Sequence, residues 1–398
     1  MKPERIGLMG GSFNPIHLAH VAVARKAMGE AALDRVLFLP TGNPPHKRDG
    51  LAPAGARFMM VRLALAQEAG FFPSDIEMNR SGTVYTVDTL KLLRSQMPWA
   101  EFYYIIGEDT LYELVHWREP EQVFQMCRFL VCPRSGTQAG AMAQAAREEL
   151  ARRGARFTFL HTAAGDASST MIRERLAMGE EPEDLHPAVT EYIRVMGLYG
   201  VNGSPPGFAG KLDRLATSMS LQRFSHTLCV AYAARQLARI HGEDAEKAAV
   251  AGLMHDCAKG MDLPLMQAYA REHGLEADPS IYASGSLLHA AVGAHMARHT
   301  FGVTDEQVLS AIACHTLGNV PMTRLDMIVY LADKIEPGRE NYPGLHEMRR
   351  LSETNLKGAV LLSLEKTASY VEARGKTLHP ATVYTMQWLR ESIENERK

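Results

Sequence analysis

The pattern of apolar residues changes at a segment rich in glycine and proline, residues 200–210, and this change constrains the fold more than any other feature. Before it, short apolar runs alternate with helix-length amphipathic stretches, at residues 6–9, 35–39, 102–106, 129–132 and 156–160. Such alternation is typical of βαβ units around a parallel sheet. After it, apolar residues recur at spacings of three and four, which indicates helices. The sequence therefore predicts an α/β domain over residues 1–200, a linker over 201–210 and an all-α domain over 211–398.

The charge and cysteine content disfavour several classes of function. Lys and Arg total 43 and Asp and Glu total 45, so the net charge of −2 draws the protein neither to nucleic acid nor to an anionic membrane. Any polyanionic partner must therefore bind at a local site. The five cysteines include no CxxC pair, which disfavours a disulfide framework and a thiolate zinc site and predicts a reducing, cytoplasmic environment. No run approaches the ~18 apolar residues of a membrane span.

A glycine-containing motif follows the first predicted strand and opens a helix predicted over residues 21–32. It begins with Gly10, Gly11, Ser12 and Phe13. Glycine lets the backbone approach a phosphate closely, and the free N–H groups and the dipole at a helix start favour an anion. His17 and His20 are three residues apart, so we expect both on the helix face that points toward this anion site. A lone histidine more often caps or packs, but the pair with the glycines favours phosphoryl or nucleotidyl transfer.

Residues 10–20, GGSFNPIHLAH, resemble the HxGH motif of the nucleotidyltransferase superfamily. Further segments narrow the resemblance to the nicotinate mononucleotide adenylyltransferases: residues 44–47, 85–89, 106–109 and 168–173, with Trp117 between the last two. The resemblance covers residues 5–199. Two positions depart from the family pattern, because Ala19 stands where glycine is usual and Arg118 stands where an aromatic residue often follows the tryptophan.

This resemblance implies a Rossmann-like nucleotidyltransferase domain that makes deamido-NAD and pyrophosphate from nicotinate mononucleotide and ATP, with Mg²⁺. The mononucleotide phosphate would attack the α-phosphorus of ATP directly, so catalysis would consist of positioning and electrostatic stabilisation. One alternative is a different nucleotidyltransferase, such as one that adenylylates phosphopantetheine. Another is an enzyme that accepts nicotinamide mononucleotide.

The resemblance also assigns roles to individual residues. The catalytic residues would be His17, His20, Lys47 and Arg173. The nucleotide-binding residues would be Gly10, Gly11, Ser12, Phe13, Thr86, Asp109, Trp117, Ser168, Ser169 and Thr170. One of the last three is a natural N-cap for the helix that follows, beside a second anion site, and Arg173 one turn later would reach the phosphates of ATP. Trp117 offers a flat face to a pyridine ring, and Asp109 follows a strand at the carboxyl end of the sheet.

The second half contains a dispersed set of histidines and aspartates, each within a helix-like segment. They are His226, His255, Asp256, His289, His315 and Asp333. Imidazole and carboxylate ligands without a thiolate suit Fe, Mn, Co or Ni as well as Zn. A lone His-Asp dipeptide is weak evidence, but the apolar run 248–254 buries the helix that leads to this one.

In order and spacing these residues resemble the HD-domain phosphohydrolases, and more narrowly the bacterial symmetrical diadenosine tetraphosphate hydrolases. The matching landmarks are Arg223 with His226, and residues 252–259, 288–294, 314–318 and 330–339, within a match over about 215–390. The resemblance implies that His226, His255, Asp256 and Asp333 hold one metal ion, with iron favoured. Asp256 would bridge to a second ion held by His289 and His315. Arg223, Lys259 and Arg339 would contact phosphates, with Lys259 in the catalytic set.

Two alternatives remain for this domain: a broader nucleotide phosphohydrolase and a non-catalytic nucleotide sensor. The complete ligand set disfavours the sensor. The other histidines have no matching context and are interpreted as surface or packing residues: His241, His273, His295, His299, His346 and His379. Nothing in the sequence distinguishes a monomer from a homo-oligomer.

Overall fold

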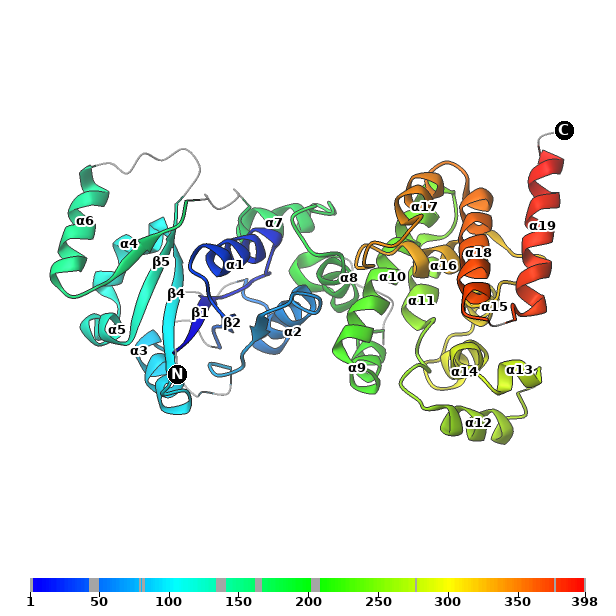
Figure 1. The fold of residues 1–398 in the computed structure, drawn as a ribbon, viewed down its shortest axis with the longest axis horizontal. Coiled ribbons are helices and arrows are strands. Elements are labelled where there is room, and N and C mark those ends of the chain that lie inside the picture. Colours follow the sequence, from blue (N-terminus) through cyan, green and yellow to red (C-terminus); the bar gives the residue numbers. More distant parts are fainter. Residues whose placement is uncertain are drawn as a thin grey trace. The chain divides into compact units, whose positions relative to one another are not determined.

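The computed structural model of the chain describes residues 3–42, 50–78, 80, 83–133, 141–161, 167–201, 208–275, 278–375 and 377–396. The chain forms two compact units, Met1–Gly203 and Ser204–Lys398. In Figure 1 the first unit runs from blue to green and the second from green to red. The division falls inside residues 201–210, the segment predicted as a linker, and helix α9 (Phe208–Ser218) begins before the predicted end of that segment.

The first unit is built on a parallel sheet. Among the described residues its strands are β1 (Glu4–Gly11), β2 (Arg35–Pro40), β3 (Phe71–Pro73), β4 (Ala100–Gly107), β5 (Cys127–Cys132) and β6 (Phe157–Phe159). They are hydrogen-bonded in the order β3-β2-β1-β4-β5-β6, and every pairing is parallel. The predicted α/β architecture is confirmed. The short strand β3 was not predicted, because three residues ending in proline carry too little pattern.

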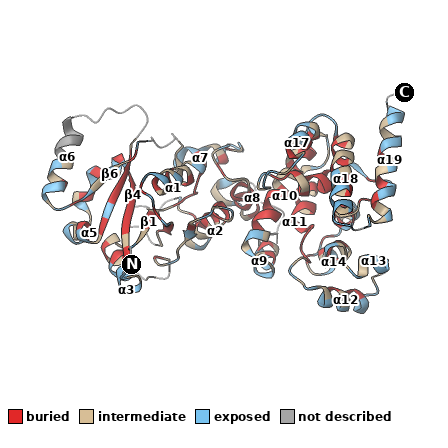
Figure 2. Ribbon diagram, viewed as in Figure 1, coloured by how far each residue is buried: buried red, intermediate tan, exposed pale blue. Residues whose placement is uncertain are grey.

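The strand order places a binding crevice at the end of β1. The chain passes from β1 outward through β2 and β3, and then returns to the other side of β1 with β4. In open α/β sheets, ligands bind beyond the carboxyl ends of the strands at such a reversal point. Gly11 ends β1 and Gly107 ends β4, so the glycine motif lies at this point. The central strands β1, β2, β4 and β5 are largely buried (red in Figure 2), as expected when helices cover both faces of a sheet.

The helices of the first unit connect these strands. They are α1 (Leu18–Glu30), α2 (Ala54–Ala64), α3 (Thr86–Gln96), α4 (Glu108–Glu113), α5 (Pro120–Met126), α6 (Ala141–Arg152), α7 (Ser169–Ala177) and α8 (Pro187–Met196), with 3₁₀ turns η1 (Leu114–His116) and η2 (Leu198–Gly200). Helix α1 begins at Leu18, three residues before the predicted start. His17 is therefore the residue just before the helix, and His20 lies in its first turn.

The second unit is helical throughout its described residues, as predicted. Besides α9 it contains α10 (Leu221–Ile240), α11 (Ala245–Met254), α12 (Leu263–Glu272), α13 (Pro279–Tyr282), α14 (Gly285–His299), α15 (Glu306–Cys314), α16 (Arg324–Ile335), α17 (Leu345–Ser352), α18 (Leu356–Ala373) and α19 (Pro380–Glu396). In the part of the chain that the structure describes, no helix is long and apolar enough to cross a membrane.

Helices α10 and α11 approach each other closely at one glycine. A β-carbon on Gly252 would lie 2.9 Å from the Cα and 3.1 Å from the backbone nitrogen of Ala231 in α10. Backbone atoms cannot move aside as a flexible side chain can, so only glycine fits. The contact matters for the site, because Gly252 lies three residues before His255.

Candidate active sites

The glycine loop of the first unit is packed against β4. A β-carbon on Gly10 would lie 2.1 Å from the hydroxyl oxygen of Tyr104, whereas one on Gly11 would make ordinary contacts of at least 3.5 Å with the ring of Phe13. The sequence prediction assigned both glycines to the close approach of a phosphate. In the structure, Gly10 must be glycine because the Tyr104 hydroxyl occupies the place of a β-carbon. Of the two glycines, only Gly11 therefore keeps the close approach of a phosphate as its proposed role.

His17 and His20 lie together at the start of α1. Their ring centroids are 3.7 Å apart, and the backbone N–H of His17 donates to Nδ1 of His20 over 3.2 Å. Because Nδ1 of His20 accepts, a neutral His20 carries its proton on Nε2. The phenyl ring of Phe13 packs edge-on against His20 at 5.2 Å. The expectation that both rings share one face is met.

Two of the helix-start donors are used inside the protein. The N–H of His17 bonds His20, and the N–H of Leu18 donates to the carbonyl oxygen of Asp184 over 2.8 Å. The prediction that the N–H groups at this helix start are free is therefore wrong for these two. The N–H of His20 is used as well, because it donates to the carbonyl of His17 over 3.0 Å, whereas Nδ1 of the buried His17 has no hydrogen-bond partner among the described residues.

The first turn of α7 lies beside the loop that follows the glycines, although about 155 residues separate them in the chain. Ser168 caps α7 by accepting from the N–H of Met171, and the hydroxyl of Ser169 donates to the carbonyl of Pro15 over 3.0 Å. Nη1 of Arg173 donates to the carbonyl of Asn14 over 2.8 Å, and its Nη2 lies 3.4 Å from Oγ1 of Thr170. The structure thus brings the two predicted anion sites together, with Arg173 bonded to the backbone of the loop.

Three residues that hold this loop were missed by sequence reasoning. Arg57 in α2 is fully buried and donates to the carbonyls of Ala52 at 3.0 Å, Ser12 at 2.7 Å and Gly42 at 3.1 Å. The side-chain oxygen of Asn14 accepts from the hydroxyl of Tyr199 at 2.8 Å. Asn14 lies inside the motif and could have been noticed, whereas Arg57 and Tyr199 carry no signal in an amphipathic helix or a turn.

Trp117 and Arg118, the residues connected with recognition of the pyridine ring, lie between η1 and α5 in the connection from β4 to β5. Trp117 is half-buried and meets the ring of Tyr104 edge-on at 5.7 Å. Arg118, the departure from the family pattern, places its guanidinium 4.7 Å from the ring centroid of Tyr85.

The other expected nucleotide contacts of this region begin helices. Thr86 is the first residue of α3, and Asp109 lies in the first turn of α4, immediately after β4. Lys47 and the segment 44–47 lie outside the described residues.

Burial keeps both histidines of the loop neutral. It lowers the pKa of His17 from 6.5 to about 4, with partial opposition from the charge of Asp184, and it lowers the pKa of His20 well below 6.5 with help from His17. We expect the His17 resonances of ¹³C-histidine-labelled protein to stay at the neutral position from pH 7.5 to 5, with His17→Gln identifying the signal. A His17 titration centred near 6.5 would contradict this.

The same shift makes the folded protein less stable in acid. The folded chain binds fewer protons at His17 than the unfolded chain does, so stability decreases as the pH falls from about 6.5 toward 4. By linkage, protonation of this one group lowers the free energy of unfolding by about 2 kcal/mol at pH 5, compared with neutral pH.

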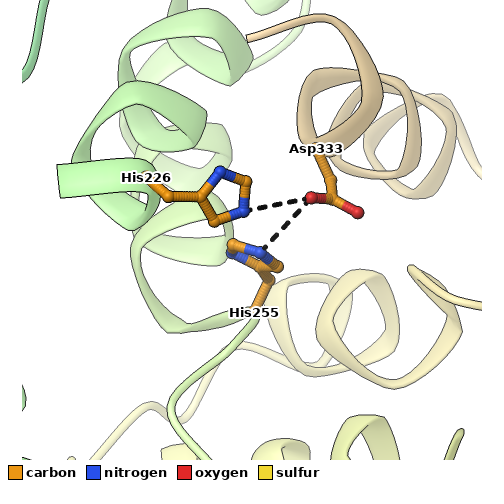
Figure 3. Close-up of side chains that lie close together, drawn as sticks. All are labelled: His226, His255 and Asp333. Atoms are coloured by element: carbon orange, nitrogen blue, oxygen red, sulfur yellow. Dashed lines mark ion pairs between the residues drawn. The ribbon is translucent and has the colours of Figure 1, made fainter. Parts of the chain in front are cut away.

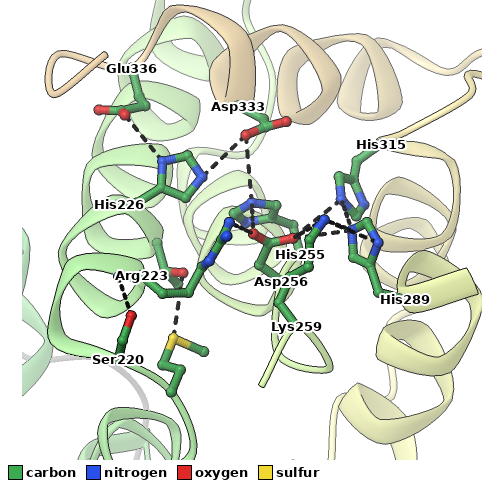
Figure 4. A network of polar contacts seen from close by, with 12 residues as sticks. Ser220, Arg223, His226, His255, Asp256, Lys259, His289, His315, Asp333 and Glu336 are labelled. Atoms are coloured by element: carbon green, nitrogen blue, oxygen red, sulfur yellow. Dashed lines mark hydrogen bonds and ion pairs between the residues drawn. The ribbon is translucent and has the colours of Figure 1, made fainter. Parts of the chain in front are cut away.

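The six predicted ligands of the second unit converge at one place (Figure 4). His226 comes from α10, His289 from α14 and Asp333 from α16. His255 and His315 were expected within helices, but each is the first residue after one, α11 and α15 respectively. All six side chains are buried: His226, His255, Asp256, His289, His315 and Asp333.

The ligand atoms form two adjacent groups. Nε2 of His226 lies 3.2 Å and Nε2 of His255 lies 3.8 Å from Oδ1 of Asp333 (Figure 3). Oδ1 of Asp256 lies 3.1 Å from Nε2 of His289 and 3.7 Å from Nε2 of His315. The other oxygen of Asp256 lies 3.5 Å from Nε2 of His255, so this carboxylate contacts both groups.

Each of the four imidazoles is oriented by a partner of its Nδ1 atom, the nitrogen that faces away from the cluster. Nδ1 of His255 donates to the carbonyl of Gly252 and Nδ1 of His315 to that of Ile312, both over 2.7 Å. Nδ1 of His289 lies 3.2 Å from the carbonyl of Gly285. Nδ1 of His226 donates to Oε1 of Glu336 over 3.1 Å.

Such outer partners are typical of metal-binding histidines, because they aim the other nitrogen, Nε2, at the ion. Nε2 of His255 is buried and makes no hydrogen bond within the described residues, so the donor set fits a divalent metal.

Cationic side chains surround the cluster. Arg223 donates to Oδ2 of Asp256 and Arg339 to Oδ1 of Asp333, over 2.8 and 2.7 Å. Nζ of Lys259 lies 3.2 Å from Nε2 of His289 and 3.9 Å from Asp256.

Lys334, which sequence reasoning missed, donates to Oδ2 of Asp333 over 2.7 Å. Although burial alone would raise the pKa of Asp333, Lys334 and His226 hold it well below its usual value, so the carboxylate is charged. Glu336 was also missed as the partner of His226. Glu336 lies within residues 330–339, one of the segments that match the phosphohydrolases, and this position could have pointed to it.

Comparison with known proteins agrees with the two-part geometry. The cytidylyltransferase-like family matches residues 8–175, and the HD domain family matches residues 223–338. A probable nicotinate-nucleotide adenylyltransferase from Gloeobacter violaceus is 43% identical over 202 residues, which are 50% of this chain and 97% of the relative. A solved structure of a predicted HD superfamily hydrolase involved in NAD metabolism, from Clostridium acetobutylicum, is 35% identical and covers 48% of this chain and 100% of its own, with a TM-score of 0.46.

Some similar proteins span both units. A probable nicotinate-nucleotide adenylyltransferase/Ap4A hydrolase from Mycoplasma genitalium is 30% identical over 375 residues, 93% of this chain and 99% of the relative. The order of the two matched families along this chain is the order in which that name gives them. The chain therefore belongs to the family of two-domain proteins that join a nicotinate-nucleotide adenylyltransferase to an Ap4A hydrolase.

Proposed function

We propose that the first unit transfers the adenylyl group of ATP, with Mg²⁺, to nicotinate mononucleotide, and that the second unit hydrolyses diadenosine tetraphosphate to two ADP with iron as its metal. One observation carries the proposal. In the first unit, His17 and His20 place their rings 3.7 Å apart at the start of α1. In the second, four buried histidines from separate positions in the chain converge within 3.8 Å of two carboxylates, those of Asp333 and Asp256.

In the first unit, the chain positions the phosphate of nicotinate mononucleotide for direct attack on the α-phosphorus of ATP. The Nε2–H group of His20 donates a hydrogen bond to an oxygen of the α-phosphate, where charge builds up during transfer. Arg173, fixed on the carbonyl of Asn14, keeps N–H groups for the departing pyrophosphate. Mg²⁺ accompanies ATP and neutralises its phosphate charge.

In the second unit, the residues hold both the metal and the substrate. A divalent metal held by these residues would polarise a phosphoryl oxygen and lower the pKa of a bound water. The histidines fix its position through their Nδ1 partners, and Asp256 links the two ligand groups. A symmetrical cut requires a β-phosphorus over the cluster, with Arg223, Lys259 and Arg339 around the remaining phosphates. Imidazole and carboxylate ligands without thiolate are compatible with iron, as they are with Mn, Co, Ni or Zn.

Chromatography of reaction products tests both activities on the full chain. With nicotinate mononucleotide, ATP and Mg²⁺ we expect deamido-NAD and pyrophosphate. Faster reaction with nicotinamide mononucleotide would contradict the first assignment. With diadenosine tetraphosphate and Fe²⁺ we expect ADP alone, and elemental analysis of purified protein should show iron. ATP plus AMP as products, or full hydrolysis by metal-free protein, would contradict the second assignment.

The two activities are expected to survive separation of the units. Each unit has its own core, and the division between Gly203 and Ser204 lies in a segment with few apolar anchors. A chain ending at Val201 should keep adenylyl transfer, and a chain beginning at Lys211 should keep hydrolysis, each within about threefold of the full chain. An insoluble half, or a first half active only when the second is present, would contradict this prediction.

A further inference from the structure

We propose that three surface histidines of the second unit, His273, His295 and His299, bind a divalent transition-metal ion such as Zn²⁺ or Ni²⁺ at a site separate from the buried cluster. These histidines had been interpreted as surface or packing residues. His295 follows His289 by six residues on α14, which places it about 9 Å farther along the helix and on a different face. The two sites therefore do not share a ligand.

The three rings lie in a row across two helices. His295 and His299 are four residues apart on α14, with ring centroids 4.2 Å apart. His273 follows the last residue of α12, and its ring stacks on His295 at 4.7 Å. Two histidines at this spacing on one helix face are a recurrent zinc-binding arrangement. His273 adds a third imidazole from a neighbouring helix.

Tyr269 orients the central ring of the row. Its hydroxyl lies 3.0 Å from Nδ1 of His295, and its ring packs against His273 at 4.3 Å. A partner on one imidazole nitrogen directs the other toward a ligand, as in the buried cluster.

The chemistry of the three groups selects the class of ion. Neutral imidazoles without carboxylate or thiolate suit Zn, Ni and Cu rather than Mg or Ca. His273 and His299 are exposed, so their rings can turn about the side-chain bonds on the picosecond to nanosecond scale and direct Nε2 toward one ion. A bound ion would join α12 to α14, which already pack through Met266, Ala270, Leu288 and Val292.

Equilibrium dialysis of the full chain against Zn²⁺, followed by elemental analysis, tests the proposal. We expect the double variant His295→Ala, His299→Ala to hold one zinc per chain fewer than the wild type. His346→Ala, an exposed histidine on α17, is the matched control and should hold as much as the wild type. Hydrolysis of diadenosine tetraphosphate, if the proposed function holds, should be unchanged in both variants, and circular dichroism checks folding independently of it.

Single substitutions keep the test decisive if the double variant folds poorly. His273→Gln and His299→Gln alter exposed side chains, and each should weaken Zn²⁺ binding at least about 10-fold. Tyr269→Phe keeps the ring and removes the hydroxyl, with an expected loss on the order of 10-fold. Electron paramagnetic resonance with Cu²⁺ should show fewer coordinating nitrogens in His273→Gln than in the wild type. Equal zinc content and affinity in the wild type and all of these variants would overturn the proposal.

Discussion

Replacing Asp256 with Asn should abolish hydrolysis and remove metal from the second unit together. The substitution keeps the shape of the side chain but removes the charge that contacts both ligand groups, 3.1 Å from His289 and 3.5 Å from His255. Loss of a residue that only orients a ligand lowers metal affinity about 10- to 100-fold, so loss of a direct ligand should exceed 100-fold. Elemental analysis and product chromatography of the same preparation measure both effects.

Lys259→Ala is the matched control for that experiment. Lys259 lies within 3.2 Å of His289 but cannot bind a metal when protonated, so its loss should spare the metal and reduce turnover. Adenylyl transfer by the first unit is the internal standard in both variants. Full metal content in Asp256→Asn, or metal loss in Lys259→Ala, would show that the ligand assignment is wrong.

Replacing His20 with Ala should lower the kcat of adenylyl transfer by about 10²- to 10³-fold while changing KM little. Removing one donor that stabilises charge in a transition state has an effect of this size. The KM for ATP should stay close to that of the wild type, because Arg57, Arg173 and Asn14 hold the loop after β1 without any contribution from His20. Steady-state kinetics at saturating Mg²⁺ measure both constants.

His20→Asn distinguishes a catalytic donor from a packing residue. Asn fills part of the space against Phe13 and can still donate from its amide, so it should recover part of the rate that Ala loses. A kcat near that of the wild type in His20→Ala, or an equal fall in thermal stability and activity, would assign His20 to packing.

The fold could be predicted well because both units carry a repeating pattern. The buried parallel strands contain continuous apolar runs, and the helices repeat apolar residues every three or four positions. The strand β3 and the start of α1 could not be predicted in the same way. A three-residue strand has no period. His17 caps α1 in a reciprocal capping box with His20, and histidine is not a common capping residue.

The candidate sites could be predicted only where motif residues carry them directly. His17, His20 and the six candidate ligands could be singled out because they stand at recognisable spacings. Arg57 was not found, because a buried arginine that bonds three carbonyls looks like any helix-surface arginine in a sequence. The reason for glycine at position 252 was equally hidden, since it depends on how closely α10 and α11 approach.

The positions of His255 and His315 at the ends of α11 and α15 have an electrostatic consequence. The carboxyl end of a helix carries a partial negative charge, about half an elementary charge, from carbonyls that lack partners in the helix. Each of these histidines satisfies one such carbonyl through Nδ1, at Gly252 and Ile312. The carbonyls hold the Nδ1 protons and make the Nε2 atoms more basic, so the backbone itself strengthens the attraction of these two imidazoles for a cation.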